Sequence, residues 1–172
     1  MLFRQQQKFM AMNDCEWAIT AATLEDIPAL CELLARLFTQ EADFKPDAQK
    51  QARGLELIIA EPSRGQLFVL RVGNRAVGMV SLLRTVSTAE GGEVFWLEDL
   101  IVAEEFRGRG LGSELLRRAI EFARRQGVPR ITVLTDLENK PAQGLYKRHG
   151  FKASAMTPMR LWLEPGQGGD PV

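Results

Sequence analysis

Apolar residues in the first third of the chain recur at the spacing of one helix face. The hydroxyl and acids of residues 23–26 are typical of a helix start, and the periodic pattern after them continues to about Gln40. Residues 47–60 repeat the pattern and end before Pro62. The pattern predicts two helices joined by the acidic and aromatic segment 41–46, which suits either a substrate lid or a plain helix connection.

The middle of the chain is rich in Val, Leu and Phe, as strands are. Residues 66–72, 76–86 and 93–102 form three such runs, and glycine-containing turns separate them. This pattern predicts three consecutive antiparallel strands. A short strand over 17–20 is expected to come before the first helix.

A strand–helix–strand unit is predicted after these strands. Residues 110–126 are apolar on one face and rich in arginine on the other, as in a helix with one solvated side. The strand at 130–135 should lie parallel to the strand before this helix, through a right-handed connection. A short helix over 141–149 follows, and we expect closing strands over 151–153 and 159–163.

The composition indicates one ordinary globular domain. The chain has 172 residues, 45% of them hydrophobic, which is enough for a full core. We expect the domain to span 16–164, with a disordered extension over 1–15 and a disordered Gly- and Pro-rich tail over 165–172. The formal net charge of +0 gives no general attraction to nucleic acid or to acidic membranes.

The sequence also favours a cytoplasmic setting. No apolar run approaches the roughly 20 residues that span a bilayer, and the first residues lack the apolar stretch of a signal peptide. Cys15 and Cys31 suggest neither a disulfide framework nor a metal site. We therefore expect no metal, no membrane partner and no nucleic acid.

The stretch with the clearest chemistry runs from Phe95 to Leu116. A strand carrying the acidic pair Glu98 and Asp99 is followed by RGRGLG, residues 107–112, and then by a helix. Glycines permit positive φ, so successive backbone N–H groups can converge on an anion, and the helix dipole points its positive end there. An acyl carrier with a pyrophosphate fits this arrangement.

Two other glycine-loop sites match less well. A P-loop would need Gly-Lys-Ser/Thr after the glycines, which this chain lacks. A dinucleotide-binding fingerprint would need a further glycine where Ser113 stands. Nucleotide or dinucleotide binding stays open as an alternative.

Two separated motifs resemble those of the GNAT superfamily of acyl-CoA-dependent N-acyltransferases. Its pattern Arg/Gln-x-x-Gly-x-Gly/Ala is matched by Arg107, Gly110 and Gly112, and Asn-x-x-Ala-x-x-Leu-Tyr-x-x-x-Gly-Phe is matched from Asn139 to Phe151. A narrower likeness links the Leu-Glu-Asp strand and the Leu-Tyr-Lys-Arg run to diamine acetyltransferases. The resemblance implies a mixed α/β fold, with a mostly antiparallel central sheet that contains one splayed parallel pair and is flanked by helices.

The resemblance also implies an acetyl-CoA site. The pantetheine arm would lie between the splayed strands, and the pyrophosphate would bind backbone N–H groups of residues 108–113. The expected cofactor contacts are Leu100, Ile101, Val102, Arg107, Gly108, Arg109, Gly110, Leu111, Gly112, Ser113, Asn139, Ala142 and Tyr146.

The catalytic roles follow from the same resemblance. The family's acidic residue falls at Glu98, the candidate base for the acceptor amine, and Tyr146 is the candidate acid for the leaving thiolate. A backbone N–H near Ile101, in a strand bulge, would polarise the thioester carbonyl. Neighbours on a strand point to opposite faces unless a bulge intervenes, so alternation does not choose between Glu98 and Asp99. His149 is interpreted as a surface residue.

The acceptor is expected to be a small primary amine, such as a polyamine, an amino acid or an amino sugar. The candidate substrate contacts are Phe38, Glu41, Phe44 and Glu98, with Asp43, Glu90 and Glu93 as further acids suited to a cation. A peptide N-terminus as acceptor and a non-catalytic acyl-CoA-binding module both stay open. A homodimer is expected because family members often pair through their edges.

Overall fold

The computed structural model describes residues 10–12, 15–40 and 45–163. The strands are β1 (Met10–Met12), β2 (Cys15–Ala21), β3 (Gly65–Val72), β4 (Arg75–Ser87), β5 (Gly92–Val102) and β6 (Ile131–Val133). The helices are α1 (Ile27–Gln40), α2 (Ala48–Ala60), α3 (Leu111–Arg125) and α4 (Lys140–Arg148), with the 3-10 turns η1 (Leu24–Asp26) and η2 (Glu104–Phe106).

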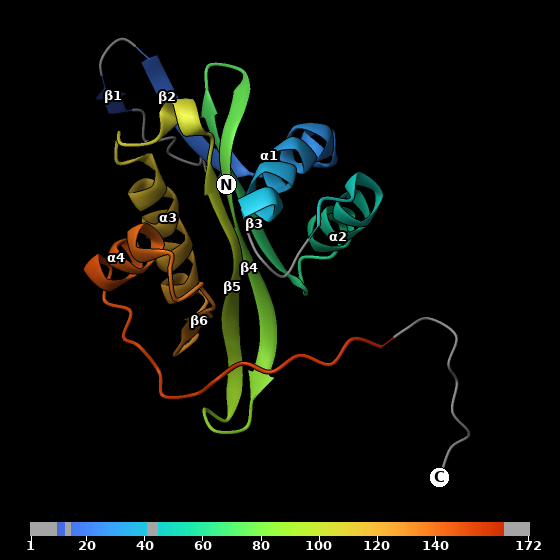
Figure 1. Ribbon diagram of the computed structural model, residues 1–172, viewed down its shortest axis with the longest axis vertical. Helices are drawn as coiled ribbons and strands as arrows, with labels where there is room; N and C mark the ends of the chain where they lie inside the picture. The colour runs from blue at the N-terminus through green and yellow to red at the C-terminus, as the bar shows by residue number, and fades with distance from the viewer. Residues whose placement is uncertain (1–9, 13–14, 41–44, 164–172) are drawn as a thin grey trace, which may run out of the picture.

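The strands form one sheet in the order β1-β2-β3-β4-β5-β6 (Figure 1). Neighbouring strands are antiparallel except β5 and β6, which are parallel because α3 connects them. Helices α1 and α2 lie on one side of the sheet, and α3 and α4 lie on the other (Figure 1). The predicted fold class, a mostly antiparallel sheet with one parallel pair and flanking helices, is confirmed.

The sheet separates two apolar cores. The core under α1 and α2 contains the buried residues Leu30, Leu34, Leu55, Leu67, Val69, Met79 and Ile101. The core under α3 and α4 contains Phe68, Leu82, Phe95, Leu97, Leu115, Leu116 and Tyr146. The two cores lie on opposite faces of β5. The core in which a β5 side chain packs therefore shows to which face of the sheet that side chain points.

The ends of the sheet differ from the sequence-based expectations. The structure has a strand at 10–12, where Met10 pairs with Trp17, although a disordered extension was expected there. The closing strands expected over 151–153 and 159–163 are wrong, because these described residues lie in neither a helix nor a strand. The sheet therefore ends at β6 among the described residues. The tail expected over 165–172 lies outside them.

No helix in the described ranges is long and apolar enough to cross a bilayer. Within the same ranges, His, Cys, Asp and Glu side chains form no group of three that could hold a metal ion.

Candidate active site

A β-bulge interrupts the pairing of β4 with β5 at the acidic pair. Leu82 pairs with Leu97 and Val80 pairs with Leu100, so two residues of β5, Glu98 and Asp99, lie opposite one residue of β4. Such a bulge inserts an extra residue, bends the strand and redirects its side chains. The candidate site therefore contains a local interruption of the β4–β5 hydrogen-bond ladder.

The bulge places both carboxylates on the same face of the sheet. Leu97 on one side of the pair and Leu100 on the other both pack in the α3 core, whereas Ile101 packs in the α1–α2 core. Strict alternation from Leu97 and from Leu100 then assigns Glu98 and Asp99 alike to the α1–α2 face. The sequence left the facing of these two neighbours open because a bulge would change it, and the bulge is present.

A buried serine holds the bulge in place. The Ser81 hydroxyl accepts a hydrogen bond from the backbone N–H of Asp99 and donates one to its carboxylate, both at 3.1 Å. Ser81 is fully buried, whereas Glu98 is exposed. The surroundings of the two carboxylates thus differ, because Asp99 is hydrogen-bonded to Ser81 of β4 whereas Glu98 is exposed to solvent.

The parallel pair separates at the same level. Pairing of β5 with β6 ends at Leu97 and Val133, although β5 continues for five more residues to Val102. Beyond that point no described residue pairs with the β6 side of β5, which is an open strand edge within the described part of the chain. An extended acyl-pantetheine arm fits such an edge, because unpaired N–H and C=O groups there can bind it as they would another strand.

The directions of the backbone N–H groups show which residues of β5 can donate hydrogen bonds at this edge. The N–H groups of Asp99 and Ala103 both point to β4, where they donate to Ser81 and Val77. By alternation the N–H of Ile101 also points to β4, and those of Leu100 and Val102 point to the open edge. The Ile101 side chain is buried in the α1–α2 core. Of the three expected strand contacts, Leu100 and Val102 thus direct their N–H groups to the open edge, whereas Ile101 directs its own to β4.

The glycine segment turns at the end of β5 and begins α3. Gly108 and Gly110 have φ of 74° and 77°, the left-handed region that favours glycine, and Gly110 is the N-cap of α3. An added Cβ at either glycine would meet no atom within 4 Å. The first N–H groups of a helix have no partner within it, so this turn presents donors in an open place, as a pyrophosphate requires. Of the expected donors, the N–H of Ser113 already bonds the Gly110 carbonyl at 2.9 Å.

Arg107 fastens the glycine segment to the strand. Its Nε donates to the Val102 carbonyl at 2.9 Å, and its guanidinium lies 3.7 Å from Glu104. The Val102 carbonyl faces the open edge, so Arg107 occupies a group that was expected to meet the cofactor.

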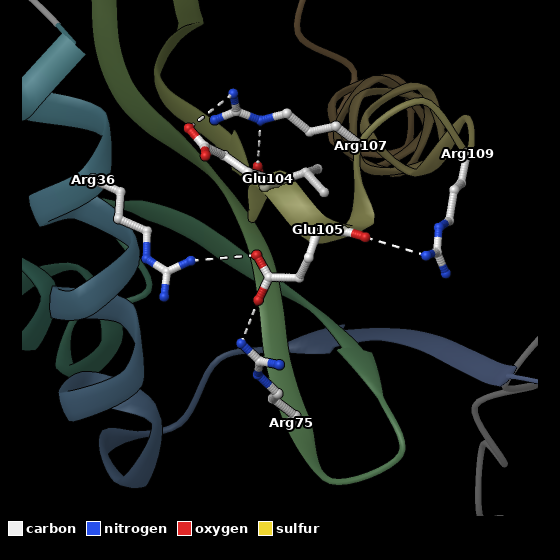
Figure 2. A network of polar contacts seen from close by, with 7 residues as sticks. Arg36, Arg75, Glu104, Glu105, Arg107 and Arg109 are labelled. Carbon is white, nitrogen blue, oxygen red and sulfur yellow. Dashed lines mark hydrogen bonds and ion pairs between the residues drawn. The ribbon is translucent and has the colours of Figure 1, made fainter.

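A network of charged residues contacts η2, which connects β5 to the glycine segment (Figure 2). The Glu105 carboxylate accepts from Arg75 at 2.5 Å and lies 3.5 Å from Arg36 of α1. Arg109 donates to the Glu105 carbonyl at 3.2 Å. A hydrogen bond from its own backbone N–H lowers the pKa of Glu105 most, and Arg75 and Arg36 lower it further against the effect of burial. The arginines here are thus bound to protein groups that fix the connection.

Helix α4 forms the other side of the glycine segment. Asn139 is its N-cap, with the side-chain oxygen accepting from the Ala142 N–H at 3.1 Å, so the amide NH2 is the group left for a cofactor. An added Cβ at Gly112 would lie 3.8 Å from both Leu145 and Val102, so α3, α4 and β5 converge here.

Tyr146 lies on the inner face of α4. Its side chain is 8% exposed and belongs to the α3 core. Its ring packs against Phe151 with centroids 5.5 Å apart. Packing therefore fixes the orientation of the Tyr146 ring, which carries the hydroxyl expected to act as the general acid.

His149 was not expected in the site, yet it lies there. The Ser113 hydroxyl and the His149 Nε2 are 2.5 Å apart, which joins the first turn of α3 to the C-terminal end of α4. The interpretation of His149 as a surface residue missed this contact. Thirty-six residues separate the two, and no spacing rule connects them.

The expected acceptor contacts are only partly brought together. Phe38 is half-buried and packs against the α1–α2 core, on the face that carries Glu98. Glu41, Asp43 and Phe44 lie outside the described residues. At the far end of β5, Glu93 pairs with Arg84, and Glu90 lies 4.0 Å from Arg130. Both acids thus form ion pairs at the end of β5 that lies away from the bulge.

Comparison with known proteins agrees with this geometry. A mostly antiparallel sheet with one parallel pair, flanked by helices, is the fold of an acyltransferase class. The chain belongs to the acetyltransferase (GNAT) family, whose family model matches residues 27–151. It is therefore an N-acetyltransferase of that family, and members of the family use acetyl-CoA.

Two curated relatives support this assignment. The chain is 29% identical over 148 residues to an uncharacterized N-acetyltransferase of Methanocaldococcus jannaschii, covering 86% of this chain and 65% of the relative. It thus spans slightly less than two thirds of that protein. It is also 29% identical over 153 residues to an aminoalkylphosphonate N-acetyltransferase of Salmonella typhimurium, covering 89% of this chain and 94% of the relative.

A solved structure supports the fold. An integron cassette protein from the mobile metagenome of Cole Harbour Salt Marsh matches with a TM-score of 0.74 and 26% identity. The match covers 86% of this chain and 91% of that one.

Proposed function

We propose that the protein transfers the acetyl group of acetyl-CoA to a primary amine of a small molecule, by direct attack within a ternary complex. The amine nitrogen forms a bond to the thioester carbonyl carbon, and the carbon–sulfur bond breaks. The amine loses a proton to Glu98, directly or through water, and the CoA thiolate gains one from Tyr146. The products are an N-acetylated amine and free CoA.

The bulge at the point where β5 and β6 separate carries this proposal. The open edge of β5 and the glycine turn are suited to the donor, while the acids lie on the α1–α2 face. An amine arriving from that face would reach the thioester beside Glu98. Holding two substrates in one geometry supplies much of the acceleration in such a reaction, because the attack becomes effectively unimolecular.

Glu98 is a better candidate base than Asp99 because of their different partners. Asp99 is held by the buried Ser81 hydroxyl, whereas Glu98 is exposed. An amine with an ordinary pKa of about 10 is protonated at neutral pH and must lose a proton before it attacks. An exposed carboxylate can accept that proton and pass it to water.

The thioester carbonyl would be polarised by backbone N–H groups at the open edge. Leu100 and Val102 direct theirs to that side of β5. A donor preorganised toward developing negative charge is typically worth about 10²–10³ in rate. The bulge fixes the spacing between this donor and Glu98, so the donor would act on the carbonyl while Glu98 accepts the proton of the attacking amine.

Small amines are the favoured acceptors, and aminoalkylphosphonates are the first to test. The Salmonella typhimurium relative named for that activity aligns with 89% of the present chain. Polyamines, amino acids and amino sugars complete the set expected from the sequence. Glu98 and Asp99 suit the ammonium group that all of these share.

The test is a CoA thiol-release assay with acetyl-CoA and a panel of amines, including a short peptide with a free N-terminus. We expect turnover with at least one small amine and none with the peptide. Glu98→Gln should lower kcat about 10²–10⁴-fold while acetyl-CoA binding, measured by calorimetry, is kept.

Glu93→Gln is the matched control, because it changes an acid of the same strand that pairs with Arg84. It should leave kcat unchanged. Unaltered turnover in Glu98→Gln would remove Glu98 from the mechanism, and acetyl-CoA binding without thiol release for any amine would favour a non-catalytic module.

A further inference from the structure

A small cavity lies on the α1 side of the sheet, apart from the bulge and the glycine segment. It has a volume of about 190 Å³ and is bordered by α1, by the hairpin that joins β3 to β4, and by the residue after β5. At about 30 Å³ for each water molecule, this volume corresponds to roughly six waters, or to a ligand with a similar number of non-hydrogen atoms. The cavity therefore suits a very small ligand.

The polar side chains that line this cavity carry charges of both signs. They are Glu32 and Arg36 of α1, and Asn74 and Arg75 of the β3–β4 hairpin. The rest of the lining consists of alanine and leucine side chains. A few convergent polar groups beside apolar ones are typical of a small-molecule site, because the polar groups fix the orientation of the ligand. We call this site the α1 cavity.

The two arginines of the α1 cavity share one carboxylate partner. The Glu105 carboxylate accepts from Arg75 at 2.5 Å and from Arg36 at 3.5 Å, and Figure 2 shows the two guanidiniums reaching it from different elements. A guanidinium has five N–H donors, so each arginine keeps donors beyond its bond to Glu105. Two positive charges beside one negative charge can therefore bind a second carboxylate.

Glu32 provides a negative charge for the other end of a ligand. It is exposed, and it precedes Arg36 by one helical turn, so the two side chains lie on the same face of α1, about 5–6 Å apart at Cβ. Among the described residues, the ion pair of Arg36 is with Glu105. The Glu32 carboxylate thus stays available to a cation that lies close to the arginines.

We propose that the α1 cavity binds a free α-amino acid with a small side chain, at a place separate from the acceptor position beside Glu98. The carboxylate of the ligand lies between Arg36 and Arg75, and its ammonium group faces Glu32. Charge-assisted hydrogen bonds of this kind are the strong ones in proteins. An α-amino acid carries its two charged groups on the same carbon atom, which matches the one-turn spacing of Glu32 and Arg36.

The α1 cavity is connected to the glycine segment through η2. Glu105 and Phe106 both belong to η2, and Arg75 contacts both, with its guanidinium carbon 5.6 Å from the centre of the Phe106 ring. The guanidinium carbon of Arg109, in the glycine segment, lies 5.4 Å from the same ring centre. A ligand carboxylate between Arg36 and Arg75 would offset their mutual repulsion and hold η2 and the glycine segment in place. We therefore expect the amino acid to be an effector that raises the affinity for acetyl-CoA; this expectation, unlike binding in the cavity, rests on the donor site proposed above.

The first test is calorimetry of the full chain with glycine as the probe and without acetyl-CoA. We expect glycine to bind, and we expect acetate, which lacks the ammonium group, to bind about tenfold or more weakly because it loses a charged hydrogen bond. Acetate that binds as tightly as glycine would show a site for anions alone and would overturn the proposal. Failure of glycine, alanine and serine all to bind would also overturn it.

Substitutions in the cavity show where glycine binds. Glu32→Gln and Arg36→Met should each weaken glycine binding about tenfold or more. Glu56→Gln and Arg53→Met are the matched controls, because these exposed residues belong to α2 and do not line the cavity, and both should bind glycine as the wild type does. Glu98→Gln should also keep glycine binding. Loss of binding in Glu98→Gln with retention in Glu32→Gln would place the amino acid at the acceptor position and overturn the proposal.

The second test measures the effect of the amino acid on donor binding, and it uses CoA, which has no acetyl group to transfer. We expect saturating glycine to raise the affinity for CoA about fivefold or more, CoA to raise the affinity for glycine by the same factor, and Glu32→Gln to remove both effects. Glycine binding with no change in CoA affinity would overturn the effector role. If CoA itself does not bind, the proposed donor site fails, whereas the first test still decides whether the cavity binds an amino acid.

Discussion

The Ser81 hydroxyl and the Asp99 carboxylate meet at 3.1 Å across the β4–β5 bulge, and the same hydroxyl accepts the Asp99 backbone N–H. This pair connects a buried side chain of one strand with the strand that carries the candidate base. The bulge positions Glu98 next to the open edge of β5, so we expect this pair to control where the candidate base lies. We therefore propose that Ser81 is a positioning residue.

Replacing Ser81 tests this relationship. Ser81→Ala leaves the Asp99 N–H and carboxylate without that partner, and we expect kcat to fall about 10–100-fold, since small misplacement of reacting groups costs up to about 10²-fold. The KM for acetyl-CoA should change little, because the glycine segment is untouched. Steady-state kinetics separate the two parameters.

Two variants serve as controls for Ser81→Ala. Asp99→Asn keeps an acceptor for the Ser81 hydroxyl and should retain most of kcat. Ser87→Ala removes a hydroxyl from the exposed end of the same strand and should have no effect. Equal loss of kcat in Asp99→Asn would mean that the Asp99 charge, and not the bulge geometry, is needed.

A substitution at Gly110 tests the glycine turn before α3, where the pyrophosphate is proposed to bind, independently of the bulge. Its φ of 77° is costly for a residue with a Cβ, so Gly110→Ala should destabilise the fold by about 1–2 kcal/mol and raise the KM for acetyl-CoA. Gly54 in α2 is the matched control, since an added Cβ there also meets no atom within 4 Å and no positive φ applies. Gly54→Ala should stabilise the protein by about 0.5–1 kcal/mol. Urea unfolding of both variants gives the comparison, and equal shifts would remove the left-handed conformation as the cause.

A substitution at Arg107 tests whether acetyl-CoA binding needs the hydrogen bond between the glycine segment and the end of β5. Arg107→Lys keeps a positive charge but loses the planar Nε donor that bonds the Val102 carbonyl. We expect about a fivefold weaker acetyl-CoA affinity by calorimetry, which corresponds to about 1 kcal/mol for one partly exposed hydrogen bond. Arg124→Met, at the exposed end of α3, should leave affinity unchanged. Full affinity in Arg107→Lys would show that charge alone matters.

Much of the scaffold was predictable because its signals are local. Helical spacing predicted α1, α2 and α3, and the meander followed from three strand-like runs. The bulge was not predictable, because it depends on Ser81 lying opposite Glu98 and Asp99, and these positions are distant in sequence. The direction of the Ile101 N–H toward β4 was not predictable for the same reason, because it depends on how β5 pairs with β4. The strands expected over 151–153 and 159–163 did not form, because strand propensity alone does not decide whether a segment pairs with a sheet edge.

Asp26 makes stability depend on pH. Burial disfavours its charge, but the Thr23 backbone N–H and the Arg71 guanidinium, at 2.6 Å, outweigh this and lower the pKa of Asp26. A carboxyl whose folded-state pKa is below its unfolded value of about 3.9 stabilises the fold above that pH. This stabilisation is lost as the pH falls through the folded-state pKa.

We therefore expect Asp26→Asn to lower the free energy of unfolding by about 1–3 kcal/mol at neutral pH, with the difference from wild type shrinking in acid. Glu25→Gln, at the exposed neighbouring position, should match the wild type throughout. Urea titrations across the acid range provide the measurement, and a difference that grows as the pH falls would contradict the sign argued here.

The contact between Ser113 and His149 yields a last prediction, because it joins two helices that both border the proposed donor site. Their atoms lie 2.5 Å apart, so Ser113→Ala and His149→Ala should each weaken acetyl-CoA binding, and the double variant should lose less than the sum. Coupled neighbours typically show interaction energies of about 0.5–3 kcal/mol in such a cycle. Calorimetry on the four proteins measures it, and His149→Gln, which keeps a hydrogen-bonding group, should recover part of the affinity. Additive losses would show that the two residues act separately and that α4 is held against α3 by apolar packing alone.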